Sequence, residues 1–266
     1  MSERERTLVV ERPEQLWRVD TRRGFLKMLG LGGTIVLLPS IFAACDSDDT
    51  TGPGTNNAVT LNLSNDFGIL NYAFALEQLE AAFYTAVLGS AAFAGMSAEQ
   101  QEVFTDLRNH EVIHREFFRA ALGSNKIGDL ALNQSAVNTT IASVSSILQN
   151  AEAFEDLGVA AYNGAGKYLT NADYLTIAGK IVSVEARHAA AIRDLREAAG
   201  TAGTPAGARF AGDDVVQTSG GTYQGLDVKL EPGVVLTRVA ATTVVSTTIT
   251  TSGLPTKTGT PDAFPA

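Results

Sequence analysis

Two short motifs in the chain pair the same side chains at the same spacing. Glu111 is followed three residues later by His114, and Glu185 is followed three residues later by His188. Residues three apart lie on one face of an α-helix, so each motif points a carboxylate and an imidazole toward the same place. A single Glu-x-x-His is most often a surface ion pair. Its repetition, using two of the three His in the chain, favours a metal site.

A Glu and a Tyr seven residues apart precede each motif. Glu77 stands before Tyr84, and Glu155 stands before Tyr162. Seven residues are nearly two helical turns, so each Glu and its Tyr share one stripe of a helix. The order Glu, Glu-x-x-His, Glu, Glu-x-x-His therefore predicts a helical hairpin that occurs twice.

Start and stop signals predict four long helices in an all-α fold. Asn, Asp and Ser caps, one capping box and several glycines mark the helix ends. The predicted helices cover residues 65–88, 97–122, 143–169 and 171–199. In each of them the Glu of interest falls about twelve to fourteen residues from the start. An antiparallel bundle of such matched helices would bring the four carboxylates into one layer.

Four inward-facing carboxylates are expensive to bury unless cations neutralise them. Their four negative charges balance two divalent ions, and two imidazoles complete a set of six ligands. The chain has one cysteine, Cys45, which excludes internal disulfides and thiolate clusters. Oxygen and nitrogen ligands suit iron or manganese better than structural zinc. The predicted metal ligands are Glu77, Glu111, His114, Glu155, Glu185 and His188.

Three side chains close to these positions are competitors or supporting groups. Glu80 lies one turn after Glu77 and could replace it as a ligand. Glu152, three residues before Glu155, competes with it in the same way. His110 falls off the inward stripe of its helix, so we expect an exposed or supporting role for it rather than ligation.

The composition of the chain excludes some classes of partner. At 266 residues, 45% of them hydrophobic, the chain can bury a full core, in one domain or in one domain plus an appendage. It carries 29 acidic and 20 basic side chains, a net charge of −9. An acidic surface argues against nucleic acid as a partner and against a polybasic membrane-binding patch.

The N-terminal region resembles an export signal. The segment TRRGFLK, with Arg22 and Arg23, is similar to the twin-arginine consensus, and an apolar run over residues 28–44 follows it. Glycines and a proline in that run make it a poor permanent membrane span. The run ends in FAAC, which resembles a lipoprotein processing box and predicts lipidation of Cys45; an ordinary buried cysteine is the alternative.

This resemblance implies a location as well. The twin-arginine route carries folded proteins, so metal could be inserted in the cytoplasm before export. The protein is then expected on the extracytoplasmic face of a membrane, in the periplasm or cell envelope, held by a lipid anchor on Cys45.

The patterns divide the chain into four parts. Residues 1–44 are predicted to be the signal peptide, 45–64 a flexible tether, 65–200 the bundle and 201–266 a C-terminal extension. The extension is rich in Thr, Gly and Val and is predicted to be irregular. A short helix or strand is possible before Ala240, and the run 241–251 is expected to be extended.

Two stretches carry a family resemblance. NYAFALEQLEAAFY, residues 71–84, and VEARH, residues 184–188, resemble the ferritin-like superfamily, in the branch that includes desiccation-associated proteins. The resemblance implies a four-helix bundle with a long crossover between helices 2 and 3, to which residues 123–142 correspond. It also implies a di-iron or di-manganese centre at the six positions above. Tyr84 and Tyr162 would support the ligands by hydrogen bonds, with simple core filling as the alternative.

The resemblance further implies how the ligands divide. Glu111 and Glu185 would bridge two metal ions, each ion would be capped by one His, and Glu77 and Glu155 would complete the two ends. The expected reaction is with O₂ or peroxide, as a ferroxidase or peroxide scavenger that protects during oxidative or drying stress.

Two alternative functions stay open. One is a manganese-catalase-like enzyme with the same six ligands. The other is a non-catalytic cell-envelope protein that keeps the bundle for stability or partner binding. A homodimer is a candidate assembly, whereas a closed iron-storage shell conflicts with a lipid anchor on every subunit.

Overall fold

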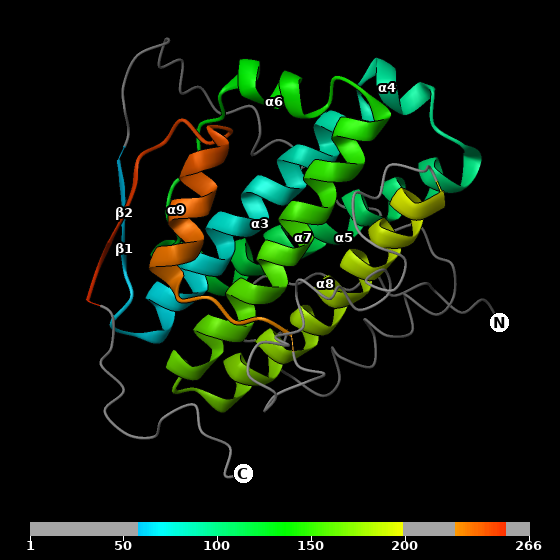
Figure 1. Ribbon diagram of the computed structural model, residues 1–266. Helices are drawn as coiled ribbons and strands as arrows, with labels where there is room; N and C mark the ends of the chain where they lie inside the picture. Colours follow the sequence, from blue (N-terminus) through cyan, green and yellow to red (C-terminus); the bar gives the residue numbers. More distant parts are fainter. Residues whose placement is uncertain (1–57, 199–226, 254–266) are drawn as a thin grey trace, which may run out of the picture. The chain divides into compact units, whose positions relative to one another are not determined.

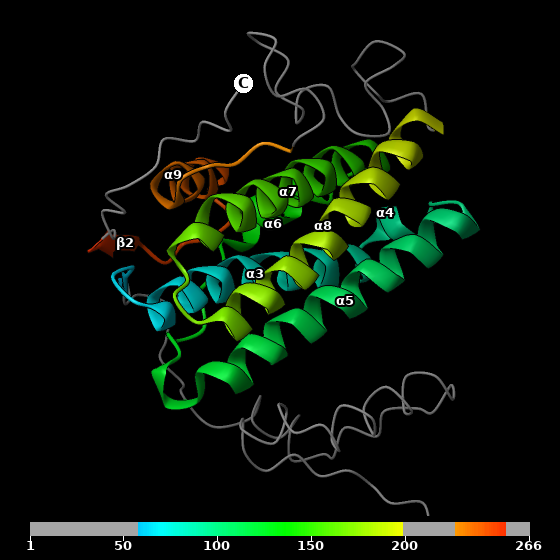
Figure 2. The same cartoon turned by 90° about the horizontal axis from the view of Figure 1, so that it is seen from below.

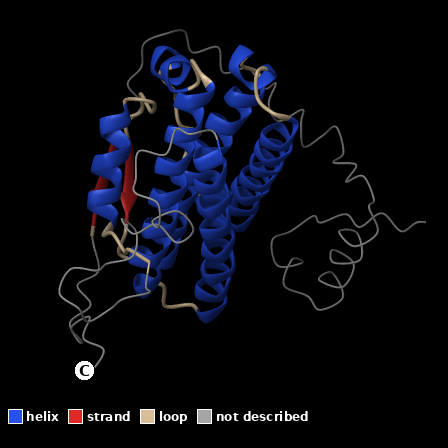
Figure 3. Cartoon of the chain, turned by 45° about the vertical axis from the view of Figure 1, so that its right-hand side comes forward, coloured by secondary structure: helices blue, strands red, loops and turns tan. Residues whose placement is uncertain are grey.

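A computed structural model describes residues 58–198 and 227–253 of the protein. These residues are mainly helical, with one two-stranded sheet among them (Figures 1 and 3). The long helices are α3 (Asp66–Leu88), α5 (Ala98–Leu122), α7 (Val144–Ala165) and α8 (Ala172–Ala198). The connections contain α4 (Ala91–Ala94), η3 (Gly123–Asn125), α6 (Gln134–Thr140) and η4 (Gly166–Tyr168). The predicted signal peptide, with Arg22 and Arg23, and the predicted lipidation site Cys45 lie outside the described residues.

The long helices begin at the predicted capping residues. Asn65 accepts a hydrogen bond from the first turn of α3, and Ser97 forms the predicted capping box with Gln100 at the start of α5. Ser143 and Asn171 accept hydrogen bonds from the first turns of α7 and α8. The third predicted helix is shorter than expected, because α7 tightens into the 3-10 turn η4 at its C-terminal end.

The four long helices pack as two hairpins, α3 with α5 and α7 with α8, and Figure 2 shows them side by side. The all-α bundle predicted from the sequence is therefore the observed fold. Helix α3 is buried on nearly every side. This explains why its own sequence carries apolar residues on all of its faces rather than along one stripe. A crossover from Gly123 to Ser143 joins the two hairpins and contains α6.

Two buried amides on α3 hold this crossover in place. Asn71 donates to the carbonyl of Asn125 at 2.8 Å and accepts from the amide of Ile127 at 2.8 Å. Gln78, two turns further along α3, accepts from the amide of Leu130 at 2.7 Å. The amide side chains thus form hydrogen bonds with backbone groups of residues 125–130, which belong to no strand of the sheet.

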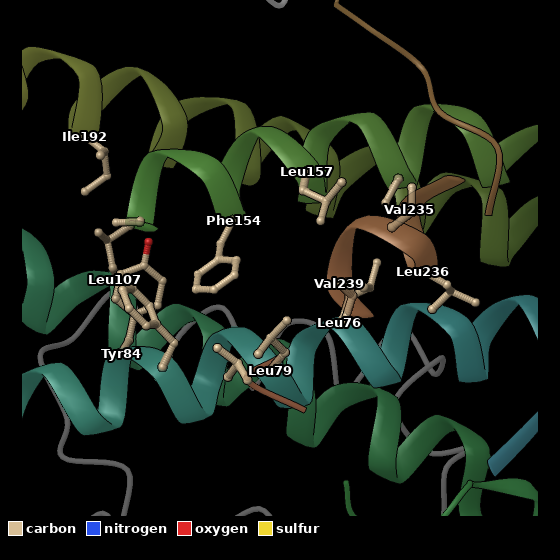
Figure 4. Close-up of a cluster of buried hydrophobic side chains, with 14 of the residues drawn as sticks. Leu76, Leu79, Tyr84, Leu107, Phe154, Leu157, Ile192, Val235, Leu236 and Val239 are labelled. Atoms are coloured by element: carbon tan, nitrogen blue, oxygen red, sulfur yellow. The ribbon is translucent and has the colours of Figure 1, made fainter. Parts of the chain in front are cut away.

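The described part of the C-terminal extension packs against the bundle. Helix α9 (Pro232–Thr242) lies on α7, and the close-up in Figure 4 shows Val235 and Val239 directed toward Leu76 of α3 and Leu157 of α7. Residues 227–253 thus contain regular structure, although their Thr- and Gly-rich composition predicted an irregular segment. The last part of the run expected to be extended does form strand β2 (Ile249–Ser252).

The partner of strand β2 lies within the predicted tether, whose C-terminal boundary is therefore wrong. The tether was expected over residues 45–64, but Val59–Asn62 forms strand β1, which pairs with β2 in parallel. Apolar side chains alternate with polar ones here, and Leu61 and Leu63 enter the core. The alternation makes this segment part of the folded unit, so a tether can extend no further than about residue 58.

None of the helices in the described ranges combines the length and the apolar character needed to cross a membrane.

Candidate metal centre

Four carboxylates meet in the middle of the bundle, one from each long helix. Glu77, Glu111, Glu155 and Glu185 are fully buried. They stand at matching depths in α3, α5, α7 and α8, and antiparallel packing places these depths in one layer. His188 of α8 is buried beside them, and the side chain of His114 of α5 is 12% exposed. The structure thus brings all six predicted ligand side chains together.

The six side chains form two overlapping groups, each centred on the Nδ1 atom of one His. His114 Nδ1 lies 3.5 Å from Glu77 Oε2, 3.3 Å from Glu111 Oε2 and 3.1 Å from Glu185 Oε1. A single N–H cannot satisfy three carboxylate oxygens, whereas one metal ion among them can.

The second group repeats this arrangement on the other hairpin. His188 Nδ1 lies 2.9 Å from Glu111 Oε1, 3.2 Å from Glu155 Oε2 and 3.8 Å from Glu185 Oε2. Each group therefore contains the His and the first Glu of one hairpin. Glu111 and Glu185 belong to both groups, and each directs one oxygen toward each His.

The donor set fits two metal ions. Glu77 Oε2, Glu111 Oε1 and both carboxylate oxygens of Glu185 are buried without a hydrogen-bond partner among the described residues. Buried carboxylate oxygens without partners are strongly unfavourable in a protein core. These are oxygens that face the two His, so cations bound between the groups would satisfy them.

Two Tyr hydroxyls form hydrogen bonds with Glu77 and Glu155, the carboxylates that each belong to one group only. Tyr84 of α3 donates a hydrogen bond to Glu155 Oε1 of α7, and Tyr162 of α7 donates to Glu77 Oε1 of α3. Each Tyr therefore supports the Glu of the opposite hairpin. Both rings are also buried in the core, so core filling and hydrogen bonding occur together.

The carboxylates and imidazoles shift one another's pKa values. Burial raises the pKa of Glu155 to about 8 and raises the pKa of Glu77 well above its usual range. Burial acts in the same direction on Glu111, but the neighbouring imidazoles of His114 and His188 outweigh it and lower the pKa of Glu111 to about 2. Burial disfavours charged His188, yet the charge of Glu155 and the close contacts with three carboxylates raise its pKa to about 12. The cluster thus retains protons that a bound metal would displace.

The three neighbouring side chains fall in different places. Glu152 forms an ion pair with Arg196 at 2.6 Å and is not among the clustered ligand groups. His110 is exposed, as its position off the stripe predicted, and its Nδ1 lies 2.9 Å from His188 Nε2. Glu80 is 3% exposed and lies beside the cluster rather than replacing Glu77 in it.

Sequence reasoning missed two kinds of residue. The roles of Asn71 and Gln78 on α3 were not predicted, although two amides on an apolar stripe seven residues apart are a readable signal. Gly158 on α7 was also passed over. A glycine in the middle of a long helix lowers helix stability, and at Gly158 an added Cβ atom would lie 3.1 Å from Glu80 Oε1.

The bundle matches a known protein family. The family model of the ferritin-like domain matches residues 65–198, half of the chain. This range begins at the N-cap of α3 and ends with α8, so it contains the bundle and all six clustered side chains. No curated protein matches the chain.

Proposed function

The chain belongs to the ferritin-like domain family, and on this premise we propose that its bundle binds two divalent ions, iron or manganese, for reaction with O₂ or peroxide. The observation that carries the proposal is the crowding of three carboxylates around the Nδ1 atom of each His. Four buried negative charges balance the charge of two divalent ions.

The geometry suggests a role for each residue. Glu111 and Glu185 would bridge the two ions, because each turns its two oxygens toward different His. His114 with Glu77 would hold one ion, and His188 with Glu155 would hold the other. Hydrogen bonds from the two Tyr fix Oε1 of each end carboxylate and leave Oε2 facing the His.

Bound there, a pair of redox-active ions supplies the electrons that reduce an O–O bond. The protein's own contribution is to orient the metal-binding side chains and to exclude water from the site. All four carboxylates are fully buried, and the tightly packed apolar side chains of the bundle core surround the layer in which they lie. Burial of this kind strengthens electrostatic interactions inside the site.

Metal analysis of the purified protein tests the proposal. We expect two ions per chain after incubation with Fe²⁺ or Mn²⁺, and reduced metal content in Glu111→Gln and Glu185→Gln. Glu152→Gln is the matched control, because Glu152 is ion-paired to Arg196 away from the cluster. Metal content unchanged in both bridging variants, or absent in the parent protein, would contradict the proposal.

Activity assays then separate the possible reactions. Oxidation of Fe²⁺ by O₂ or peroxide would identify a ferroxidase or peroxide scavenger. Disproportionation of peroxide by the manganese form would identify a catalase-like enzyme. Bound metal with neither activity would indicate a non-catalytic scaffold. A protective role in oxidative or drying stress rests on the resemblance to desiccation-associated proteins, and the peroxide assay tests its chemical basis.

We also propose that the protein is exported and anchored to a membrane through lipidated Cys45. The support is the twin-arginine-like sequence around Arg22 and Arg23 and the processing-box-like sequence before Cys45. In a bacterial host with a twin-arginine system, we expect the mature protein in the membrane fraction. An Arg22→Lys, Arg23→Lys double variant should stay in the cytoplasm as precursor. Equal export of this charge-matched variant would refute the route, and membrane association of Cys45→Ser would refute the anchor.

A further inference from the structure

A fifth carboxylate, Glu80, lies beside the four that form the candidate metal centre. It stands on α3 three residues after Glu77, on the same face of the helix. Only 3% of the residue is exposed. Neither of the two groups of clustered ligands contains it.

Glu80 differs from the other four carboxylates in having no favourable partner. Burial raises its pKa, and so do the charges of Glu185, Glu111, Glu155 and Glu77. Each of the other four has a His within ion-pairing distance. Among the described residues, neither a hydrogen bond nor an ion pair reaches Glu80. A carboxylate in these surroundings destabilises the folded state unless a cation joins it.

Helix α7 carries a glycine, and thus no side chain, at the position that faces Glu80. Gly158 stands on α7 three residues after Glu155, so it occupies the position that corresponds to Glu80 in the other hairpin. A Cβ atom added to Gly158 would lie 3.1 Å from Glu80 Oε1 and 3.5 Å from Glu185 Oε2. The two carboxylates therefore converge on the space that the missing side chain leaves.

The Glu185 oxygen beside Gly158, Oε2, shows which of the two His lies on the same side as Glu80. Glu185 Oε2 is buried without a hydrogen-bond partner, and it is the oxygen that faces His188. Glu80 thus approaches the cluster on the side of His188 rather than on the side of His114, although it belongs to the same helix as Glu77.

We propose that Glu80 is a seventh metal-binding side chain, which ligates the ion on the His188 side together with Glu185. This inference rests on the proposed function. It makes the two ions inequivalent, because the His188 ion has one more protein carboxylate than the His114 ion. The fifth negative charge exceeds the four that balance two divalent ions, so it strengthens binding of a more highly charged cation on that side.

Co²⁺ titration of the metal-free protein, followed by absorption spectroscopy and calorimetry, tests this assignment. In Glu80→Gln we expect one of the two ions to bind at least about ten-fold more weakly. The metal-free variant should unfold at the same or a higher temperature than the parent, because a neutral amide replaces a carboxylate without partners. Weaker metal binding with undiminished metal-free stability is the signature of a ligand, and a merely structural residue would not produce it.

Gly158→Ala provides a second variant that keeps every carboxylate. Its new Cβ atom would lie 3.1 Å from Glu80 Oε1, so this carboxylate must shift by a few tenths of an ångström and the same ion should bind more weakly. Gly179→Ala is the matched control, since a Cβ on Gly179 of α8 meets no atom within 4 Å and should leave both ions unaffected.

The possible outcomes are distinguishable. If the parent binds two ions and Glu80→Gln binds both equally well, the seventh ligand is refuted and the proposed function stands. A lower unfolding temperature of metal-free Glu80→Gln, with parallel loss of both ions, would also refute it. If the parent binds no metal, the proposed function itself fails.

Discussion

His188 uses both of its ring nitrogens. Nδ1 faces the carboxylates, and Nε2 lies 2.9 Å from Nδ1 of His110, whose ring is nearly parallel to that of His188 with centroids 5.2 Å apart. A His that binds metal through Nδ1 carries its proton on Nε2, so His110 must accept that hydrogen bond. Burial and the charge of His188 lower the pKa of His110, which favours the neutral ring that can accept. His110 is therefore suited to orient His188.

Replacement of His110 by Ala should weaken binding of one metal ion. Loss of such an outer hydrogen bond typically reduces metal affinity about 10- to 100-fold, and we expect a value near the lower end because His110 is exposed. Titration with Co²⁺ measures both affinities. Asn109→Ala, at the neighbouring exposed position of α5, is the control. Two unchanged affinities in His110→Ala would show that the contact with His188 has no influence on the site.

At the scale of elements, the segment before α9 depends on a glycine in α7. The amide of Leu230 donates to the carbonyl of Ala160 at 2.9 Å, so this segment runs directly against the helix. A Cβ on Gly164 would lie 1.8 Å from the carbonyl oxygen of Leu230. Only glycine allows this approach of two backbones. Contacts of α9 with α3 and α7 follow from it (Figure 4).

Two Gly-to-Ala substitutions should therefore have opposite effects on stability. Gly164→Ala must push the segment of Leu230 away, and overpacking of this kind costs about 1–3 kcal/mol. Gly179→Ala adds a methyl group in open space on α8 and should stabilise by about 0.5–1 kcal/mol through higher helix propensity. Urea unfolding of both variants measures the difference. Equal stability of the two proteins would mean that the C-terminal segment does not pack on α7.

At the scale of the whole molecule, the charged centre makes stability depend on pH and metal together. The folded metal-free protein retains protons that the unfolded chain releases, because the pKa of Glu155 rises from 4.5 to about 8 and that of His188 rises from 6.5 to about 12. Each raised pKa contributes stability that is complete below the unfolded value and lost as pH rises through the folded value. The lowered pKa of Glu111 acts oppositely, but only below its ordinary value of 4.5.

The melting temperature of the metal-free protein should thus decrease as the pH rises from about 5 to about 8. Metal needs ionised carboxylates and neutral imidazoles, so stabilisation by Mn²⁺ should grow over the same interval. Thermal scans at several pH values, with Mn²⁺ and with a chelator, measure both trends. A metal-free melting temperature that increases across this interval would contradict the protonation pattern derived for the cluster.

Much of this protein followed from local sequence signals. Caps, glycines and apolar periodicity act within one or two helical turns, so they located α3, α5, α8 and the start of α7 nearly to the residue. Periodicity also showed that Glu77, Glu111, Glu155 and Glu185 point inward at matching depths. Since buried carboxylates must be satisfied, their meeting in one layer could be predicted without a structure. Alternation of apolar residues before Asn65 could have revealed β1 and was overlooked.

Contacts between elements were decided only by tertiary structure. Which oxygen of Glu111 faces which His, and which hairpin receives the hydroxyl of Tyr84, depends on how helices pack. The same holds for the contact of His110 with His188, for Glu80 opposite Gly158, and for the pairing of β1 with β2 across 190 residues. Helical periodicity assigns a side chain to a face of its own helix. It carries no information about the neighbour on that face, because packing of the whole chain selects that neighbour.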